Sequence, residues 1–189
     1  MKKTSIILIS IIVIIGILAV LIIGKYNSII TMAEQVDTNM SNLDVMLQRR
    51  ADLIPNLVNV VKGYTQHENE AIQTVVEARE KLVNSNSIED KSKASEQLTT
   101  ALNGLMVVVE NYPDLKASEN FTQLSYELAG TENRISVARR DYNDAVKNYN
   151  LTIKKFPDNL IANIFGFNEE AYFETDEANT SVPKVDFMQ

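Results

Sequence analysis

The stretch RRADLIPN, residues Arg49–Asn56, decides how many helices the N-terminal half of the chain forms. Apolar residues recur at helical spacing on both sides of it, yet it holds a cluster of charges and a proline. Proline is tolerated in the first turn of a helix but costs about 3 kcal/mol in a helix interior, because it lacks an N–H. The stretch therefore predicts a bend, with Arg49 and Arg50 at the end of one helix and another helix that begins at Pro55. Asp52 either caps this second helix or interacts favourably with the positive end of its dipole.

An uncharged aliphatic run, IILISIIVIIGILAVLII, precedes this stretch from Ile6 to Ile23. At about 1.5 Å per residue it spans roughly 27 Å, close to the thickness of a bilayer's hydrocarbon core. A cleaved signal peptide is the alternative, since Lys2 and Lys3 are positive and Gly24 is small. The apolar region of a signal peptide is usually only about 7 to 15 residues long, and no Ala-x-Ala site is present. We therefore predict a retained single-pass anchor in the cell membrane over residues 1–24.

Charges beside the anchor indicate its orientation. The amino group of Met1 and the side chains of Lys2 and Lys3 outnumber Lys25 on the far side, which favours a cytoplasmic N-terminus. The margin is one or two charges, so the side on which the rest of the chain lies is left open. The net charge of -7 argues against a nucleic-acid partner, and the absence of cysteine excludes a lipoprotein anchor.

Four stripes of apolar residues at helical spacing follow the anchor, over residues 26–47, 57–82, 94–112 and 121–156. Ser87 and Asp90 lie at capping-box spacing before the third stripe, and Pro113 ends it. The fourth stripe is a heptad pattern formed by Phe121, Leu128, Ile135, Tyr142, Tyr149 and Phe156. We therefore predict an all-α fold, in which an N-terminal transmembrane helix precedes an up-down antiparallel four-helix bundle.

The predicted topology divides the chain into an anchor (1–24), a helical bundle (25–168) and an irregular acidic tail (169–189). Residues 49–56 and 111–116 then cap the end of the bundle far from the membrane, and residues 156–167 return beside the anchor. The apolar residues of this returning segment either contact lipid headgroups or cap the base of the bundle, and capping is favoured. These residues are Leu160, Ile161, Ile164, Phe165 and Phe167.

No motif for catalysis or cofactor binding stands out. The chain has one histidine and no cysteine, and His67 lacks the second histidine that an HExxH zinc helix requires. There is no G-x-S-x-G motif, and the six glycines are isolated, so they form no phosphate-binding loop. We therefore predict no catalytic residue, no cofactor and no metal, and a protein that is not an enzyme.

Two groups of polar residues are candidates for binding a partner. The first lies at the predicted bend and consists of Arg49, Arg50, Asp52 and Asn56. The second lies along the fourth stripe and consists of Glu132, Arg139, Asn143 and Asn150. Interhelical hydrogen bonds that fix the register of the bundle are the alternative role for the second group, and this alternative is favoured.

Four stretches of the sequence resemble the bacterial LemA family: RRADLIPNLVNVVKGYTQHE (49–68), ENRISVARRDYNDAVKNYN (132–150), FPDNLIANIFGF (156–167) and VPKVDF (182–187). The resemblance covers nearly all of the chain from Tyr26 to Phe187. It implies a membrane-anchored protein with an antiparallel four-helix domain, cytosolic or extracytosolic, and no established activity or cofactor. Family descriptions often place the N-terminus outside, opposite to the charge count.

The resemblance also implies partners at a membrane. Members are similar to proteins encoded near membrane metalloproteases and TPM-domain proteins, and one branch is linked to magnetosome membrane formation. The favoured function is a non-enzymatic scaffold or adaptor that contacts the lipid bilayer, a membrane protein of these kinds and other copies of itself. The alternative is a membrane-remodelling or self-assembling protein that acts at the bilayer surface.

Overall fold

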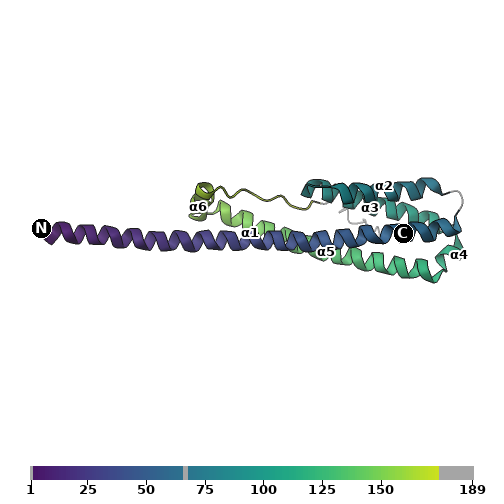
Figure 1. Cartoon of the computed structure of the whole chain (residues 1–189), viewed down its shortest axis with the longest axis horizontal. Coiled ribbons are helices and arrows are strands. Elements are labelled where there is room, and N and C mark those ends of the chain that lie inside the picture. Colours follow the sequence, from purple (N-terminus) through teal and green to yellow (C-terminus); the bar gives the residue numbers. More distant parts are fainter. Residues whose placement is uncertain (1, 66–67, 175–189) are drawn as a thin grey trace, which may run out of the picture. The chain divides into compact units, whose positions relative to one another are not determined.

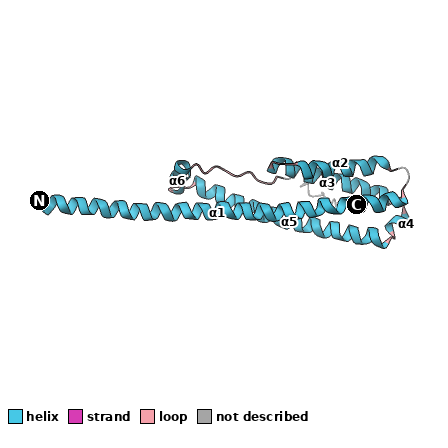
Figure 2. Ribbon diagram, in the orientation of Figure 1, coloured by secondary structure: helices cyan, strands magenta, loops and turns pink. Residues whose placement is uncertain are grey.

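The computed structural model of the chain describes residues 2–65 and 68–174 (Figure 1). They form six helices: α1 (Lys2–Tyr64), α2 (Asn69–Asn84), α3 (Ile88–Val109), α4 (Pro113–Lys116), α5 (Glu119–Lys154) and α6 (Asp158–Phe165). No strand occurs among these residues (Figure 2), so the predicted all-α class is confirmed. His67, the motif VPKVDF and most of the predicted tail at 169–189 lie outside the described residues.

The chain divides into two compact units. The anchor unit comprises Met1–Leu43 and Ala138–Ala171, and the body unit comprises Asp44–Val137 and Tyr172–Gln189. Buried side chains of the anchor unit include Ile29, Val36, Tyr142, Val146, Tyr149 and Ile161. Those of the body unit include Ile54, Leu57, Val61, Val75, Leu98, Leu105 and Leu115. The predicted division into 1–24, 25–168 and 169–189 stays a prediction, as does the complete four-helix bundle.

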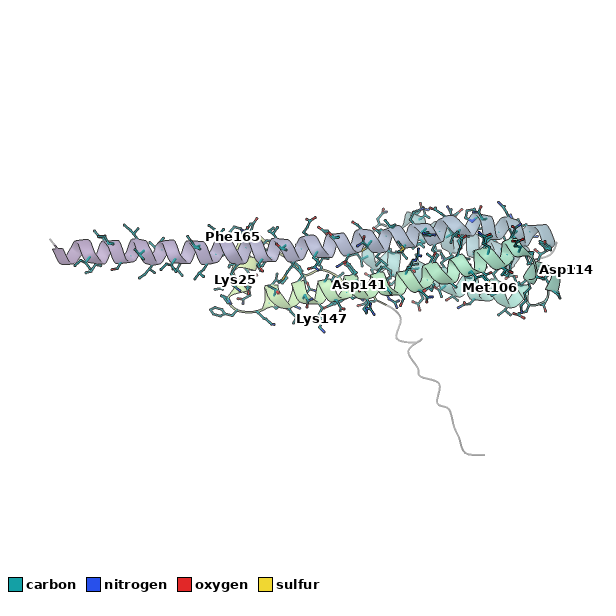
Figure 3. All side chains as sticks on the ribbon, turned by 90° about the horizontal axis from the view of Figure 1, so that it is seen from below. Lys25, Met106, Asp114, Asp141, Lys147 and Phe165 are labelled. Atoms are coloured by element: carbon teal, nitrogen blue, oxygen red, sulfur yellow. The ribbon has the colours of Figure 1, made fainter. Side chains whose placement is uncertain are left out.

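The N-terminal part of α1 carries the apolar run of the predicted anchor. Among the described residues, α1 is the one helix that is long and apolar enough to cross a membrane, and its most apolar window is entirely unburied. The side chains from Ile6 to Ile23 project from the ribbon without being covered by the rest of the anchor unit (Figure 3). Such exposure of aliphatic side chains is expected where lipid replaces protein as the neighbour.

The predicted bend at RRADLIPN is wrong, because α1 continues through it. Pro55 lies inside the helix and has no N–H to donate to the carbonyl oxygen four residues earlier, which belongs to Ala51. Arg79 of α2 supplies the missing donor, since its Nε donates to the Ala51 carbonyl oxygen at 2.9 Å. The apolar face also continues across the proline, where Ala51, Ile54 and Leu57 are buried. This hydrogen bond and this buried face together offset the cost of an interior proline.

Removing Arg79 is expected to cost more stability when Pro55 is present than when it is absent. In Arg79→Ala the partly buried Ala51 carbonyl loses its donor, which lowers the free energy of unfolding by about 1.5 kcal/mol. In a Pro55→Ala background the restored backbone N–H bonds the same carbonyl, so the loss falls to about 0.5 kcal/mol. Chemical denaturation of the complete double-mutant cycle, followed by circular dichroism, measures the difference. Lys81→Ala, an exposed change on the same helix, is the control, and equal losses in both backgrounds would contradict this role of Arg79.

The boundary between the first two helices lies further along the chain than predicted, because α1 ends at Tyr64 and α2 begins at Asn69. Glu68, which interrupts the apolar pattern of residues 57–82, lies at this boundary. The Tyr112 hydroxyl, just before α4, donates to Glu68 Oε1 at 2.8 Å, and this bond to a carboxylate raises the pKa of Tyr112. The segment after α3 therefore lies at the turn between α1 and α2. The prediction that 49–56 caps the same end as 111–116 is wrong, because 49–56 lies within α1.

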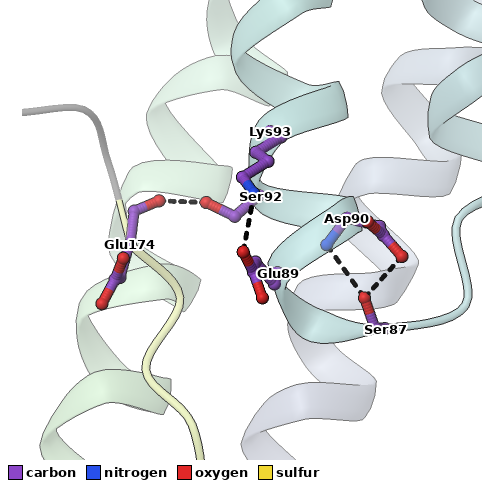
Figure 4. Close-up of polar contacts among 6 residues, drawn as sticks. All are labelled: Ser87, Glu89, Asp90, Ser92, Lys93 and Glu174. Carbon is purple, nitrogen blue, oxygen red and sulfur yellow. Dashed lines mark hydrogen bonds and ion pairs between the residues drawn. The ribbon is translucent and has the colours of Figure 1, made fainter.

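The predicted N-cap at Ser87 is confirmed (Figure 4). Ser87 Oγ accepts a hydrogen bond from the Asp90 N–H at 3.0 Å and donates to Asp90 Oδ2 at 2.6 Å. One turn further along α3, the Ser92 hydroxyl donates to the backbone oxygen of Glu174, beside the buried side chain of Phe173. The first turns of α3 thus hold the extended segment that follows α6.

The heptad pattern of the fourth stripe forms α5 and accounts for its buried face. The buried members are Phe121, Leu128 and Ile135 in the body unit and Tyr142 and Tyr149 in the anchor unit. Phe156 departs from the prediction: it lies beyond the last residue of α5 and is 79% exposed. Pro157 gives the reason, since the residue before a proline disfavours the helical conformation.

Candidate partner-binding surface

Three of the predicted residues, Arg49, Asp52 and Asn56, lie on one exposed face of α1 in the body unit. Their spacing of three and then four residues places them on successive turns of the same side. The prediction that Asp52 lies at the start of a helix is wrong. The Asp52 Oδ1 atom accepts a hydrogen bond from Gln48 Nε2 at 2.8 Å, within the same helix. The three polar side chains are therefore available on the surface of the body unit.

These residues line a groove of about 860 Å³, here called the α1–α2 groove. At its edge, Lys91 Nζ of α3 donates to both carboxylate oxygens of Asp44 at 2.7 Å. A second groove of about 650 Å³, here called the α1–α5 groove, lies between Arg49 and the first half of α5. Arg49 and Glu127 line both grooves, so the two grooves adjoin.

Large apolar side chains are exposed in both grooves. Val45 and Val83 are 59% and 44% exposed in the α1–α2 groove, and Tyr126 is 76% exposed in the α1–α5 groove. The sequence reasoning missed all three. A signal was present for Tyr126, because it is an aromatic residue that falls outside the heptad positions of Phe121 and Leu128.

Arg50, the fourth residue of this predicted group, lies in the interior. Its side chain is 4% exposed, its Nη1 atom donates to Thr99 Oγ1 at 3.0 Å, and it lies 2.7 Å from Glu132 Oε2. Burial lowers the pKa of Arg50, and the negative charge of Glu132 opposes this shift. The ion pair thus joins a residue from each predicted group and connects α1 with α5, and the hydrogen bond to Thr99 connects α1 with α3. These contacts are within the protein, so we do not include Arg50 in the partner-binding surface.

The other predicted residues of α5 belong to the anchor unit. Arg139 and Asn143 are half-buried, whereas Asn150 is 4% exposed. Asn150 Nδ2 donates to the Glu170 carbonyl at 2.8 Å, and its Oδ1 accepts from the Glu170 N–H at 2.9 Å. Asn150 therefore has a structural role, but its partner is the non-helical backbone after α6 and not another helix as predicted.

The chemistry of the two grooves suits the binding of a protein surface. The grooves are lined by the exposed apolar residues Val45, Val83 and Tyr126. They are also lined by positive side chains (Arg49 and Arg134) and negative ones (Asp52 and Glu127). An apolar centre with a polar rim is typical of protein interfaces. Among the described residues, no three His, Cys, Asp or Glu side chains form a group that could hold a metal ion.

Comparisons with known proteins give relatives over most of the chain. A family model described as the LemA family matches residues 39–187. Magnetosome protein MamQ 2 of Paramagnetospirillum magneticum is 29% identical over 196 residues, covering 90% of this chain and 72% of the relative. Protein LemA of Metamycoplasma hominis is 28% identical over 166 residues, covering 86% and 75%. Magnetosome protein MamQ of Magnetospirillum gryphiswaldense is 27% identical over 175 residues, covering 79% and 64%.

Proposed function

This chain belongs to the LemA family, and we propose that it is a membrane-anchored, non-enzymatic scaffold or adaptor that holds a protein partner beside the bilayer. The observation that carries this proposal is the pair of adjoining grooves in the body unit, which are lined by exposed apolar residues and by charged residues of both signs. The apolar run of α1 supports the anchoring part, because its side chains are not covered by protein.

The proposed partner is a membrane protein that binds across both grooves at Arg49. A membrane protease or a TPM-domain protein is the kind of partner that we propose to test first. Exposed aromatic residues with polar neighbours often contribute most of the binding energy of an interface, and Tyr126 is the residue of this kind here. Its ring can bury a large apolar area while its hydroxyl stays hydrated.

Tyr126→Ala is expected to reduce capture of the partner by about tenfold or more, corresponding to at least roughly 1.4 kcal/mol. The measurement is photo-crosslinking of the full chain in native membranes, with a photoreactive residue at Asn56 and the adducts identified by mass spectrometry. The same residue placed at Glu80, exposed on α2 and outside both grooves, is the matched control. Equal adducts from both positions, or adducts unaffected by Tyr126→Ala, would contradict the assignment of the grooves.

We further propose a single-pass arrangement in the cell membrane with the N-terminus in the cytoplasm and the body unit outside. The positive charges of Lys2 and Lys3 support this orientation through the positive-inside rule. Protease protection in sealed vesicles of known orientation tests it. Digestion of the body unit from the cytoplasmic side would reverse the assignment and place the partner in the cytoplasm.

A second candidate function is membrane remodelling or self-assembly at the bilayer surface. It is favoured by Phe156, Leu160 and Ile164, whose exposed fractions of 79%, 52% and 76% leave apolar surface uncovered around α6. If crosslinking in native membranes recovers other copies of the chain and lipid, with no second protein, this function replaces the adaptor.

A further inference from the structure

Helix α6 is attached at both ends to the residues that follow the apolar run of α1, within the anchor unit. At its start, Asp158 Oδ1 lies 3.0 Å from Lys25 Nζ. At its end, the rings of Phe165 and Phe167 lie 4.7 Å and 5.8 Å from the ring of Tyr26, measured between centroids. Lys25 and Phe165 accordingly lie close together in Figure 3. These contacts fix the position of α6 along α1.

That position is the level at which the apolar run ends. Lys25 follows Ile23 by two residues, which is about 3 Å along the helix axis. If residues 6–23 span the hydrocarbon core, Lys25 and Tyr26 lie in the headgroup region. Lysine and tyrosine are suited to this region, because each has an apolar stem or ring and a polar tip.

Helix α6 has one face against the protein and one face uncovered. Asp158, Ile161 and Ala162 are buried, whereas Leu160 and Ile164 are 52% and 76% exposed. The two exposed aliphatic residues are four apart and therefore lie on one flank of the helix. The ring of Phe156, just before α6, is 79% exposed and Phe165 at its end is 53% exposed. Asn163 is exposed on the other flank, next to the half-buried Asn159, so the uncovered surface has an apolar side and a polar side.

We propose that α6 is a second membrane-contacting element, which lies in the headgroup–acyl boundary of the leaflet where α1 emerges. Phe156, Leu160 and Ile164 enter the lipid, while Asn163 faces water. The apolar surface of α6 lies at the same depth as the end of the membrane-spanning part of α1, which lipid surrounds in this arrangement. A second copy of the chain is a weaker occupant, because the exposed parts of these few side chains fall well short of the about 800 Å² per partner that a stable interface buries.

This inference rests on the anchoring part of the proposed function and not on the partner-binding grooves. With α6 in the bilayer, the ion pair and the ring contacts couple its depth to the depth of α1. The position of α1 along the membrane normal is then set at two points, the span and α6, which resists sliding of the long helix. A helix of this length that contacts the membrane only through its span lacks this second contact, which opposes movement along the membrane normal.

The absence of cysteine from the chain allows a direct test by single-cysteine labelling. Ile164→Cys and Asn163→Cys, made in the full chain, are labelled with an environment-sensitive fluorophore and reconstituted in vesicles of phosphatidylethanolamine and phosphatidylglycerol. A lipid that carries a nitroxide high on its acyl chain is expected to quench the label at residue 164 about twofold or more above the label at residue 163, with iodide giving the reverse order. Circular dichroism checks that both variants keep their helix content.

A label at Ile14→Cys, in the middle of the apolar run, separates the failure of this inference from the failure of the anchor. If the label at residue 14 is quenched by a lipid carrying the nitroxide deep in the chain but the label at residue 164 is quenched only by iodide, the anchor stands and the α6 contact is overturned. The proposal is also overturned if residue 164 is protected from both quenchers and this protection is lost when the protein is diluted in lipid. That result would place a second copy of the chain against α6. If residue 14 is not quenched by lipid, the anchoring itself is refuted and the α6 proposal falls with it.

Discussion

Tyr142→Ala is expected to lower the free energy of unfolding by about 4 kcal/mol, the largest effect of any single change considered for this protein. Tyr142 is fully buried in the anchor unit, and its hydroxyl donates to the Ala171 carbonyl at 2.7 Å. Alanine leaves a large cavity and an unpaired carbonyl together. Chemical denaturation of the full chain in detergent, followed by circular dichroism, measures the loss. Tyr126→Ala, which removes an exposed ring from the same helix, is the matched control and should cost less than about 0.5 kcal/mol.

Tyr142→Phe isolates the hydroxyl and carries a pH signature. Burial, with the nearby carboxylates of Glu170 and Asp37, raises the pKa of Tyr142 to about 12. The folded state therefore holds the phenol proton more tightly than the unfolded state, whose tyrosine titrates near pH 10. The stabilisation from this group is fully present below about pH 10 and is lost as the pH rises toward 12.

Tyr142→Phe should cost about 1 kcal/mol at neutral pH and flatten the loss of stability above pH 10. A residual slope is expected from Tyr149, whose pKa is raised by burial in the same unit. The readout is a series of denaturation curves between pH 7 and the alkaline limit, compared between the two proteins. An unchanged slope in Tyr142→Phe would show that this hydroxyl is not the group that titrates.

Glu132→Ala is the second large change, with an expected loss of about 3 kcal/mol. The side chain of Glu132 is 45% exposed, but its partner Arg50 is 4% exposed, so removing the carboxylate leaves a charge buried without its counterion. Arg50 cannot release its proton at ordinary pH, and its Nε atom already lacks an acceptor among the described residues. The unpaired guanidinium must therefore draw water into the body unit or move outward.

Replacing both partners by apolar residues should restore most of this stability. In Arg50→Met with Glu132→Leu no charge is left buried, and the packing volume is nearly kept, so we expect the double variant to be at least about 1.5 kcal/mol more stable than Glu132→Ala. Asp144→Ala, an exposed acidic residue of the same helix, is the control for loss of a carboxylate alone. If the double variant is less stable than Glu132→Ala, the ion pair contributes net stability and this account of its energetics is wrong.

Local features were predictable because they depend on residues close in sequence. The apolar run of α1, the Ser87 cap and the heptad face of α5 each follow from spacing within one helix, and the structure has all three. The same holds for part of the candidate surface, since Arg49, Asp52 and Asn56 share a helix face. Tyr126 was recognisable in principle as an aromatic residue outside the heptad positions.

What the sequence alone determined about this protein is its helical class, its apolar run and its family, because each is written in composition, periodicity or motif. Only the tertiary structure decided the course of α1 through RRADLIPN. The free energy that Pro55 costs the helix depends on whether Arg79, from another helix, reaches the Ala51 carbonyl. Whether the Arg50 side chain points into the protein depends on Glu132, far along the chain. A contact between distant residues leaves no periodic trace in either helix. The sequence therefore predicted a bend at Pro55, which lies within the continuous helix α1 on its exposed side, and a surface position for Arg50, which is buried.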